Sequence, residues 1–189
     1  MPRPKRTRFT ILGALTLRPM SGYDIKKFIQ GSIANFWRES YGQLYPTLRE
    51  LTDEGLVSRR DETRDGKRGR YVYSITPQGR EALRDWLAEP AEWEVPRSEL
   101  LLKIFFGTEV PAETSLDHVA RRREELRADQ ERLSAIAATL KRERATAPGL
   151  PFWLLTIRQG WLVNEALIAW CDEAEDVLRG VKAADRGGA

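Results

Sequence analysis

Residues 40–57 read SYGQLYPTLRELTDEGLV, and this stretch decides the fold. Three leucines recur at a helical spacing and form one apolar stripe: Leu44, Leu48 and Leu51. Ser40 and Gln43 have the spacing of a capping box, and Gly55 follows as a helix terminator. Pro46 conflicts with a helix that begins at Ser40, because its ring removes a backbone donor. The sequence therefore predicts a bent or late-starting helix here.

A basic β-hairpin is predicted directly after this helix. Residues 56–61 and 70–75 alternate apolar and polar side chains on either side of the tip RDGKRGR, residues 64–70. A helix followed by a basic ribbon is the arrangement of a winged helix on DNA, with the helix in the major groove and the ribbon on flanking phosphates. Residues 1–87 are therefore predicted to be a winged helix-turn-helix DNA-binding domain.

Three further helices complete this predicted domain. The first covers residues 7–17, and the second begins behind a capping box formed by Ser21 and Asp24. Four side chains of the second helix are expected to be buried: Tyr23, Ile25, Phe28 and Ile29. Thr76 and Pro77 start the last helix, whose apolar face is expected to hold Leu83, Trp86 and Leu87.

The second half of the chain is predicted to be α-helical and to form the dimer. A linker at 88–96 precedes a short helix at 97–106 and long helices at 112–144 and 152–181. One heptad position of the first long helix is apolar throughout and is the predicted dimer interface: Val119, Leu126, Leu133 and Leu140. The other seam position of the heptad holds Arg123 and Gln130, so the coiled coil would be weak alone and needs further packing against other elements. The fold class is thus mainly α with a small β-hairpin, and residues 97–189 are the expected dimerisation domain.

The distribution of charge supports this division. Residues 1–86 hold 17 Lys and Arg against 10 Asp and Glu, a balance of +7, whereas residues 87–189 hold 14 against 18, a balance of −4. A basic first half indicates a module that binds a polyanion such as nucleic acid. No apolar run approaches the ~20 residues that span a bilayer, no signal peptide opens the chain, and a single cysteine excludes an internal disulfide. These features favour a cytoplasmic protein.

The candidate DNA contacts come from the helix and the hairpin. On the helix, six side chains are predicted to face DNA or solvent: Ser40, Tyr41, Gln43, Tyr45, Thr47 and Arg49. Glutamine can pair with adenine, arginine with guanine and tyrosine with the backbone. On the hairpin, Lys67, Arg68 and Arg70 are predicted to bind phosphates. The alternatives are an ordinary core helix and a solvated run of charges.

Several short motifs in a fixed order give the first 87 residues a family resemblance. They are ILGAL at 11–15, SGYDI at 21–25, FW at 36–37, GQLYPTL at 42–48, EGLV at 54–57 and YSITPQGR at 73–80. This pattern resembles the winged-helix domain of the PadR family of bacterial transcriptional regulators. The layout of the second half is similar to the longer PadR subgroup that includes the virulence activator AphA. The resemblance implies a homodimer on double-stranded DNA with a two-fold operator, repression more often than activation, and in many members an aromatic effector near the dimer interface.

The tryptophans offer a candidate effector site. Trp86, Trp153 and Trp161 could line a concave apolar site where the fourth helix meets the long helices. Tryptophans more often pack in a core or an interface than line a ligand site, and this is the favoured alternative. Cys171 is expected to be buried filler, and His118 solvated. With one histidine, one cysteine, no phosphate loop and no metal-ligand spacing, the chain is not expected to be an enzyme or to hold a metal or cofactor. An adaptor that reuses a winged helix without binding DNA is the remaining rival.

Overall fold

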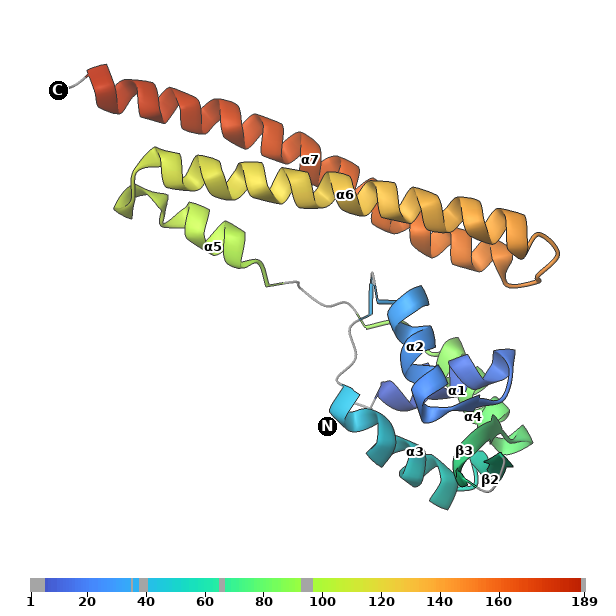
Figure 1. The fold of residues 1–189 in the computed structure, drawn as a ribbon. Helices are drawn as coiled ribbons and strands as arrows, with labels where there is room; N and C mark the ends of the chain where they lie inside the picture. Colours follow the sequence, from blue (N-terminus) through green and yellow to red (C-terminus); the bar gives the residue numbers. More distant parts are fainter. Residues whose placement is uncertain (1–5, 35, 38–40, 65–66, 93–96, 188–189) are drawn as a thin grey trace. The chain divides into compact units, whose positions relative to one another are not determined.

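A computed structural model describes residues 6–34, 36–37, 41–64, 67–92 and 97–187 of the chain. The chain divides into two compact units, residues 1–93 and 94–189. Short helices and a small sheet make up the first unit, and two long helices lying side by side dominate the second (Figure 1). No helix in the described part of the chain is long and apolar enough to cross a membrane.

The first unit opens with two helices that follow the sequence prediction closely. α1 spans Thr7–Leu17, and α2 spans Gly22–Ser32. The capping box is confirmed: the Ser21 hydroxyl accepts a hydrogen bond from the Asp24 amide, and the Asp24 carboxylate accepts one from the Ser21 amide, both at 3.2 Å. Ile25 and Ile29 are buried, but Tyr23 is 68% exposed, so the prediction that it is buried is wrong. Tyr23 comes two residues before Ile25, and two residues of an α-helix turn by about 200°, so Tyr23 lies on the opposite face of α2.

The third helix begins later than Ser40. A 3-10 turn, Tyr41–Gln43, leads into α3, which spans Leu44–Asp53. Pro46 therefore lies in the first turn of α3, where a missing amide costs no helical hydrogen bond. The late start resolves the conflict seen in the sequence. Ser40 lies outside the described residues, and Gln43 caps the helix without a side-chain hydrogen bond.

Gly55 ends α3 as predicted. Its φ of 74° is left-handed, a conformation that favours glycine. The Gly55 amide donates to the Thr52 carbonyl at 3.1 Å, and the Leu56 amide donates to the Leu51 carbonyl at 2.9 Å. This pair of bonds is a Schellman motif, which turns the chain sharply from α3 into the sheet.

The predicted hairpin is present and is longer than expected. β2 spans Val57–Arg64 and β3 spans Lys67–Ile75, so the strands continue to either side of residues 65–66, which lie outside the described part. A two-residue strand, β1 at Met20–Ser21, pairs antiparallel with β3 and gives the sheet order β1-β3-β2. β1 was not predicted, because a strand of two residues shows no periodicity in the sequence.

α4 spans Pro77–Ala88 and starts on the junction between α3 and β2. The Thr76 amide donates to the Leu56 carbonyl at 3.1 Å, and the Thr76 hydroxyl donates to the Gly55 carbonyl at 2.8 Å. A Cβ on Gly79 would lie 2.1 Å from the Leu56 carbonyl oxygen, so only glycine allows the helix to come this close. Leu83 is buried, but Leu87 is 65% exposed, which corrects its predicted place on the apolar face. It lies in the last turn of α4, beyond the core that ends at Leu83 and Trp86.

The second unit is a hairpin of two long helices preceded by a short one. α5 spans Glu99–Phe105, a 3-10 turn follows at Gly107–Glu109, α6 spans Ala112–Glu143 and α7 spans Leu150–Gly187. Figure 1 shows α6 and α7 side by side along most of their lengths. α7 extends beyond the predicted range at both ends.

The heptad residues of α6 pack against α7 of the same chain. Val119 and Leu126 are fully buried and form a cluster with Cys171 of α7, and Leu133 is 3% exposed. Leu140 is half-buried. The prediction that this row forms the dimer interface is therefore contradicted for the three buried members, because α7 already covers them. A heptad repeat shows that a helix has a partner, and here the partner lies in the same chain.

The two polar residues of the neighbouring heptad position also find their partners on α7. The Arg123 guanidinium pairs with Asp172 at 2.9 Å and with Glu175, and Gln130 donates to the Trp161 carbonyl at 3.3 Å. The Arg123 Nε is buried and has no hydrogen-bond partner among the described residues. Polar groups therefore tie the helices together where apolar ones are absent.

Candidate nucleic-acid interface

α3 presents one exposed polar face. Gln43, Tyr45 and Arg49 are exposed, as predicted. Thr47 is 2% exposed and cannot face DNA, so its predicted exposure is wrong. It lies three residues after Leu44 and one before Leu48, which places it within the buried stripe. The side chains of Ser40 and Tyr41 lie outside the described part.

The ring of Tyr45 lies against the start of α2. A Cβ added to Gly22 would lie 2.7 Å from the Cε1 of Tyr45, so the ring lies over bare backbone. Gly22 is buried, whereas Tyr45 remains 53% exposed. The first turn of α2 thus sets where this aromatic ring points on the exposed face of α3. The sequence places a glycine, Gly22, at the first position of α2, but it does not reveal that Tyr45 is the residue that lies against this glycine.

The hairpin carries cations along both strands. Arg59, Arg60 and Arg70 are exposed, and Arg59 lies over the Tyr71 ring at 4.3 Å from its centroid. Lys67 belongs to β3, but its side chain and that of Arg68 lie outside the described part. The predicted phosphate contacts of these two residues stay predictions.

Arg70 is paired with two carboxylates. Its Nε lies 3.2 Å from Glu62 on β2, and a terminal nitrogen lies 3.6 Å from Asp24 at the start of α2. The hydrogen bond from the Ser21 hydroxyl has the largest effect on the pKa of Asp24 and lowers it despite partial burial. The hydrogen bond from the Ser21 amide and then the charges of Arg70 and Arg18 lower this pKa further. A phosphate that meets Arg70 must therefore compete with two anions. Asp24 and Glu62 were not predicted as neighbours of this cation.

The three tryptophans of the predicted effector site occupy different places. Trp86 stacks on Phe9 in the first unit, with ring centroids 4.5 Å apart and the planes 4° apart. Trp153 lies near Gly149 at the start of α7, and Trp161 lies farther along that helix. Since Trp86 packs against the core of the first unit, no pocket within either unit holds all three.

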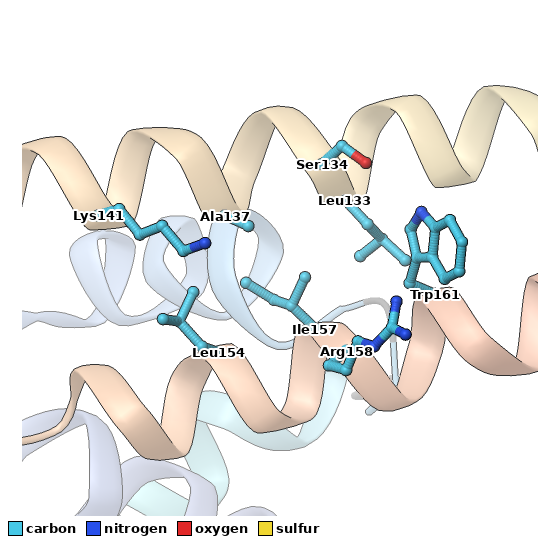
Figure 2. A pocket seen from close by; sticks show the side chains of 8 residues that line it. All are labelled: Leu133, Ser134, Ala137, Lys141, Leu154, Ile157, Arg158 and Trp161. Carbon is cyan, nitrogen blue, oxygen red and sulfur yellow. The ribbon is translucent and has the colours of Figure 1, made fainter.

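Trp161 lines a groove between α6 and α7. Its volume is about 280 Å³, and four aliphatic side chains form its apolar surface: Leu133, Ala137, Leu154 and Ile157. Figure 2 shows Lys141 on α6 near one end and Arg158 on α7 beside Trp161 near the other. The Arg158 guanidinium lies 4.7 Å from the centroid of the Trp161 ring.

The described residues contain no cluster of three or more histidine, cysteine or acidic side chains that could hold a metal ion. Cys171 is buried, and desolvation raises the pKa of its thiol. A thiol kept protonated is a poor nucleophile. Among the described residues, the exposed α3 face and the cationic hairpin have the chemistry of a surface that binds nucleic acid.

Comparison with known proteins agrees with this reading. The family profile described as transcriptional regulator PadR-like family matches residues 11–85, and the profile described as virulence activator alpha C-term matches residues 96–179. The Vibrio cholerae virulence activator AphA has 30% sequence identity and a TM-score of 0.72, over 93% of this chain and 99% of that one. The chain belongs to the PadR-like family. It is a transcriptional regulator of that family and not an enzyme.

A second PadR-like relative is known by function and by structure. The negative transcriptional regulator PadR of Bacillus subtilis is 29% identical over 147 residues, which are 77% of this chain and 79% of the relative. Its crystal structure with operator DNA gives a TM-score of 0.79 at 24% identity, over 90% of this chain and 98% of that one. The same protein has also been crystallised with p-coumaric acid. At this identity the structural match shows a shared PadR-like fold.

Proposed function

We propose that this chain is a sequence-specific DNA-binding repressor that acts as a homodimer on a two-fold operator. The observation that carries the proposal is the exposed face of α3, where Gln43, Tyr45 and Arg49 are free to meet base edges and backbone. The adjoining hairpin supplies cations for flanking phosphates. The relative from Bacillus subtilis is a negative regulator crystallised on operator DNA, which supports repression and an operator target.

The dimer is proposed to form through apolar side chains of the second unit that the chain itself leaves uncovered. Phe105 is 80% exposed and Phe106 59%, and on α7 Phe152 and Leu155 are 70% and 66% exposed. Large aromatic and aliphatic groups of this kind are enriched in the buried centres of protein interfaces. These side chains form two patches near opposite ends of α6, whose 32 residues span about 48 Å at 1.5 Å per residue. They replace the heptad row of α6, which α7 already covers. Two subunits would place two copies of α3 on two half-sites.

The test begins with a footprint on the DNA that flanks the gene, followed by titration of the protected fragment at several salt concentrations. Gln43→Ala or Arg49→Ala should relax sequence preference, with each base contact contributing about 1–3 kcal/mol. Replacing Lys67, Arg68 and Arg70 together by glutamine should weaken binding to all sequences and flatten the salt slope by about one unit per lost phosphate contact. Arg84→Gln, at an exposed cation of α4, is the matched control and should change neither.

Two results would overturn the proposal. If the triple hairpin variant binds the operator as tightly as the unaltered protein, the hairpin does not grip phosphates. If the unaltered protein shows no salt-dependent binding to any DNA, the chain is an adaptor that uses a winged helix for protein contacts.

A further inference from the structure

The groove between α6 and α7 combines an apolar surface with cations and without acids. Its aliphatic side chains would exclude water from a ligand, while Lys141 and Arg158 add two positive charges near opposite ends (Figure 2). No carboxylate lines it. Ligand sites in proteins combine apolar walls with a few charged groups in this way, and at about 280 Å³ the volume suits a small ligand.

Among the described residues, several arginines of the same helices lie in ion pairs, but the two cations of the groove do not. Within the described part of the chain, Arg123, Arg132 and Arg179 each lie in an ion pair with an acidic side chain, whereas Lys141 and Arg158 enter none. The local composition explains the difference. Residues 133–164 contain four Lys and Arg and one acid, Glu143, a balance of +3 in a half of the chain whose overall balance is −4. Glu143 pairs with Arg142, which leaves the groove without a carboxylate of its own.

We propose that this groove binds a small amphipathic organic anion with an apolar body and one carboxylate. The body lies on Ala137, Leu154 and Ile157, where it displaces water from aliphatic surface. The carboxylate meets the ammonium of Lys141, because the Arg158 guanidinium already lies over the Trp161 ring. A cationic ligand would be repelled by both side chains, and a neutral one would leave the charges unused. The site concerns ligand binding alone, and only its regulatory meaning rests on the proposed repressor function.

Intrinsic tryptophan fluorescence of the full chain tests the site. The probes are octanoate and p-coumarate, which share a carboxylate but have an aliphatic and an aromatic body, and 1-octanol as the neutral control. A carboxylate probe should change the emission saturably, and Trp161→Phe should remove most of that change. A signal from octanoate alone assigns an aliphatic ligand, and a signal from p-coumarate alone assigns an aromatic one.

Variants separate the groove from the rest of this basic region. Lys141→Gln should weaken carboxylate binding about tenfold or more, the value of one charge-assisted hydrogen bond. Arg144→Gln removes a neighbouring exposed cation that does not line the groove and should have no effect. Ala137→Leu fills the groove and should abolish binding, whereas Ala138→Leu adds the same group at an exposed position and should not.

Three outcomes would overturn the proposal: no saturable change with either carboxylate, equal binding of 1-octanol and octanoate, or unaltered binding by Ala137→Leu. If the carboxylates fail and Ala137→Leu dissociates the protein in sedimentation, a second copy of the chain occupies the groove instead. Operator binding is measured on the same samples. Loss of operator recognition with intact carboxylate binding would refute the repressor function and leave the site standing, and the reverse result would refute the site alone.

Discussion

Truncating Leu126 to alanine should destabilise the second unit of each chain rather than separate two subunits. Leu126 is fully buried and packs with Val119 and Cys171. Leucine-to-alanine changes in such positions cost about 2–5 kcal/mol. Leu133, at 3% exposure, should behave alike. The two residues lie two helical turns apart, about 10 Å at 1.5 Å per residue, so their effects should nearly add to about 4–10 kcal/mol. That approaches the about 5–15 kcal/mol that stabilises a typical protein.

Urea unfolding followed by circular dichroism measures this loss, and sedimentation on the same samples reports the oligomeric state. Leu155→Ala is the matched control: it removes the same atoms from a residue of α7 that is 66% exposed within the chain. In the monomeric chain it should change the free energy of unfolding by no more than about 0.5 kcal/mol. If Leu155 lies in the dimer interface, the variant should shift the monomer–dimer equilibrium.

The opposite pattern would refute the packing of α6 on α7. A variant with aspartate at both Leu126 and Leu133 buries two unpaired charges, so it should lose helix content. If that variant instead remains folded, helical and monomeric, the row is an interface between subunits after all. If it remains both folded and dimeric, the row is not buried at all.

Three further changes follow from the geometry. Gly79→Ala should lower the free energy of unfolding in urea by about 1–3 kcal/mol, because the added Cβ meets the backbone of Leu56. Gly31→Ala, whose added Cβ has nothing within 4 Å, should be neutral or stabilising. Equal effects of the two changes would refute the close approach of α4 to Leu56. Asp24→Asn keeps a capping side chain but loses the charge. Since the folded state lowers the pKa of Asp24, ionised Asp24 stabilises the fold above the usual carboxyl pKa of about 3.9, and this stabilisation disappears as pH falls through the pKa of the folded state. The free energies of unfolding of the two proteins should therefore converge in acid. A difference between these free energies that does not change with pH would contradict this. Cys171 should react slowly with iodoacetamide in the folded protein and rapidly in urea, and a native rate matching the unfolded one would show that the thiol is not buried.

Local signals in the sequence predicted local structure well. The capping box of Ser21 and Asp24, the proline at the start of α4 and the glycine after α3 each act through the nearest backbone groups, and the structure contains all three. The long glycine-free and proline-free stretch of α6 was predicted within one residue at its end. Such features need no knowledge of distant residues, which is why the sequence reveals them.

The misplaced residues all depend on contacts made at a distance. Thr47 was expected on the exposed face of α3, yet α3 buries a stripe wide enough to include it. The row of Val119 and its heptad partners has the period of a helix–helix seam, but a period carries no information on whether the second helix belongs to the same chain. Arg70 reads as a free cation in sequence, and only the fold brings Asp24 beside it.

A helix hairpin held only by a repeating apolar row could assemble in several alignments. Sliding α6 along α7 by seven residues returns leucine to leucine but moves Arg123 by about 10 Å, at 1.5 Å per residue. Its guanidinium would then leave Asp172 and Glu175, while its Nε is already buried without a partner. Removing one partner of a buried ion pair costs about 3–5 kcal/mol. The cost is smaller for Arg123, whose side chain is one-fifth exposed, but it still makes the slipped alignments less stable than the native one. Arg123 thus fixes the register of α6 on α7, because its ion pairs form in one alignment of the two helices and are lost in the others.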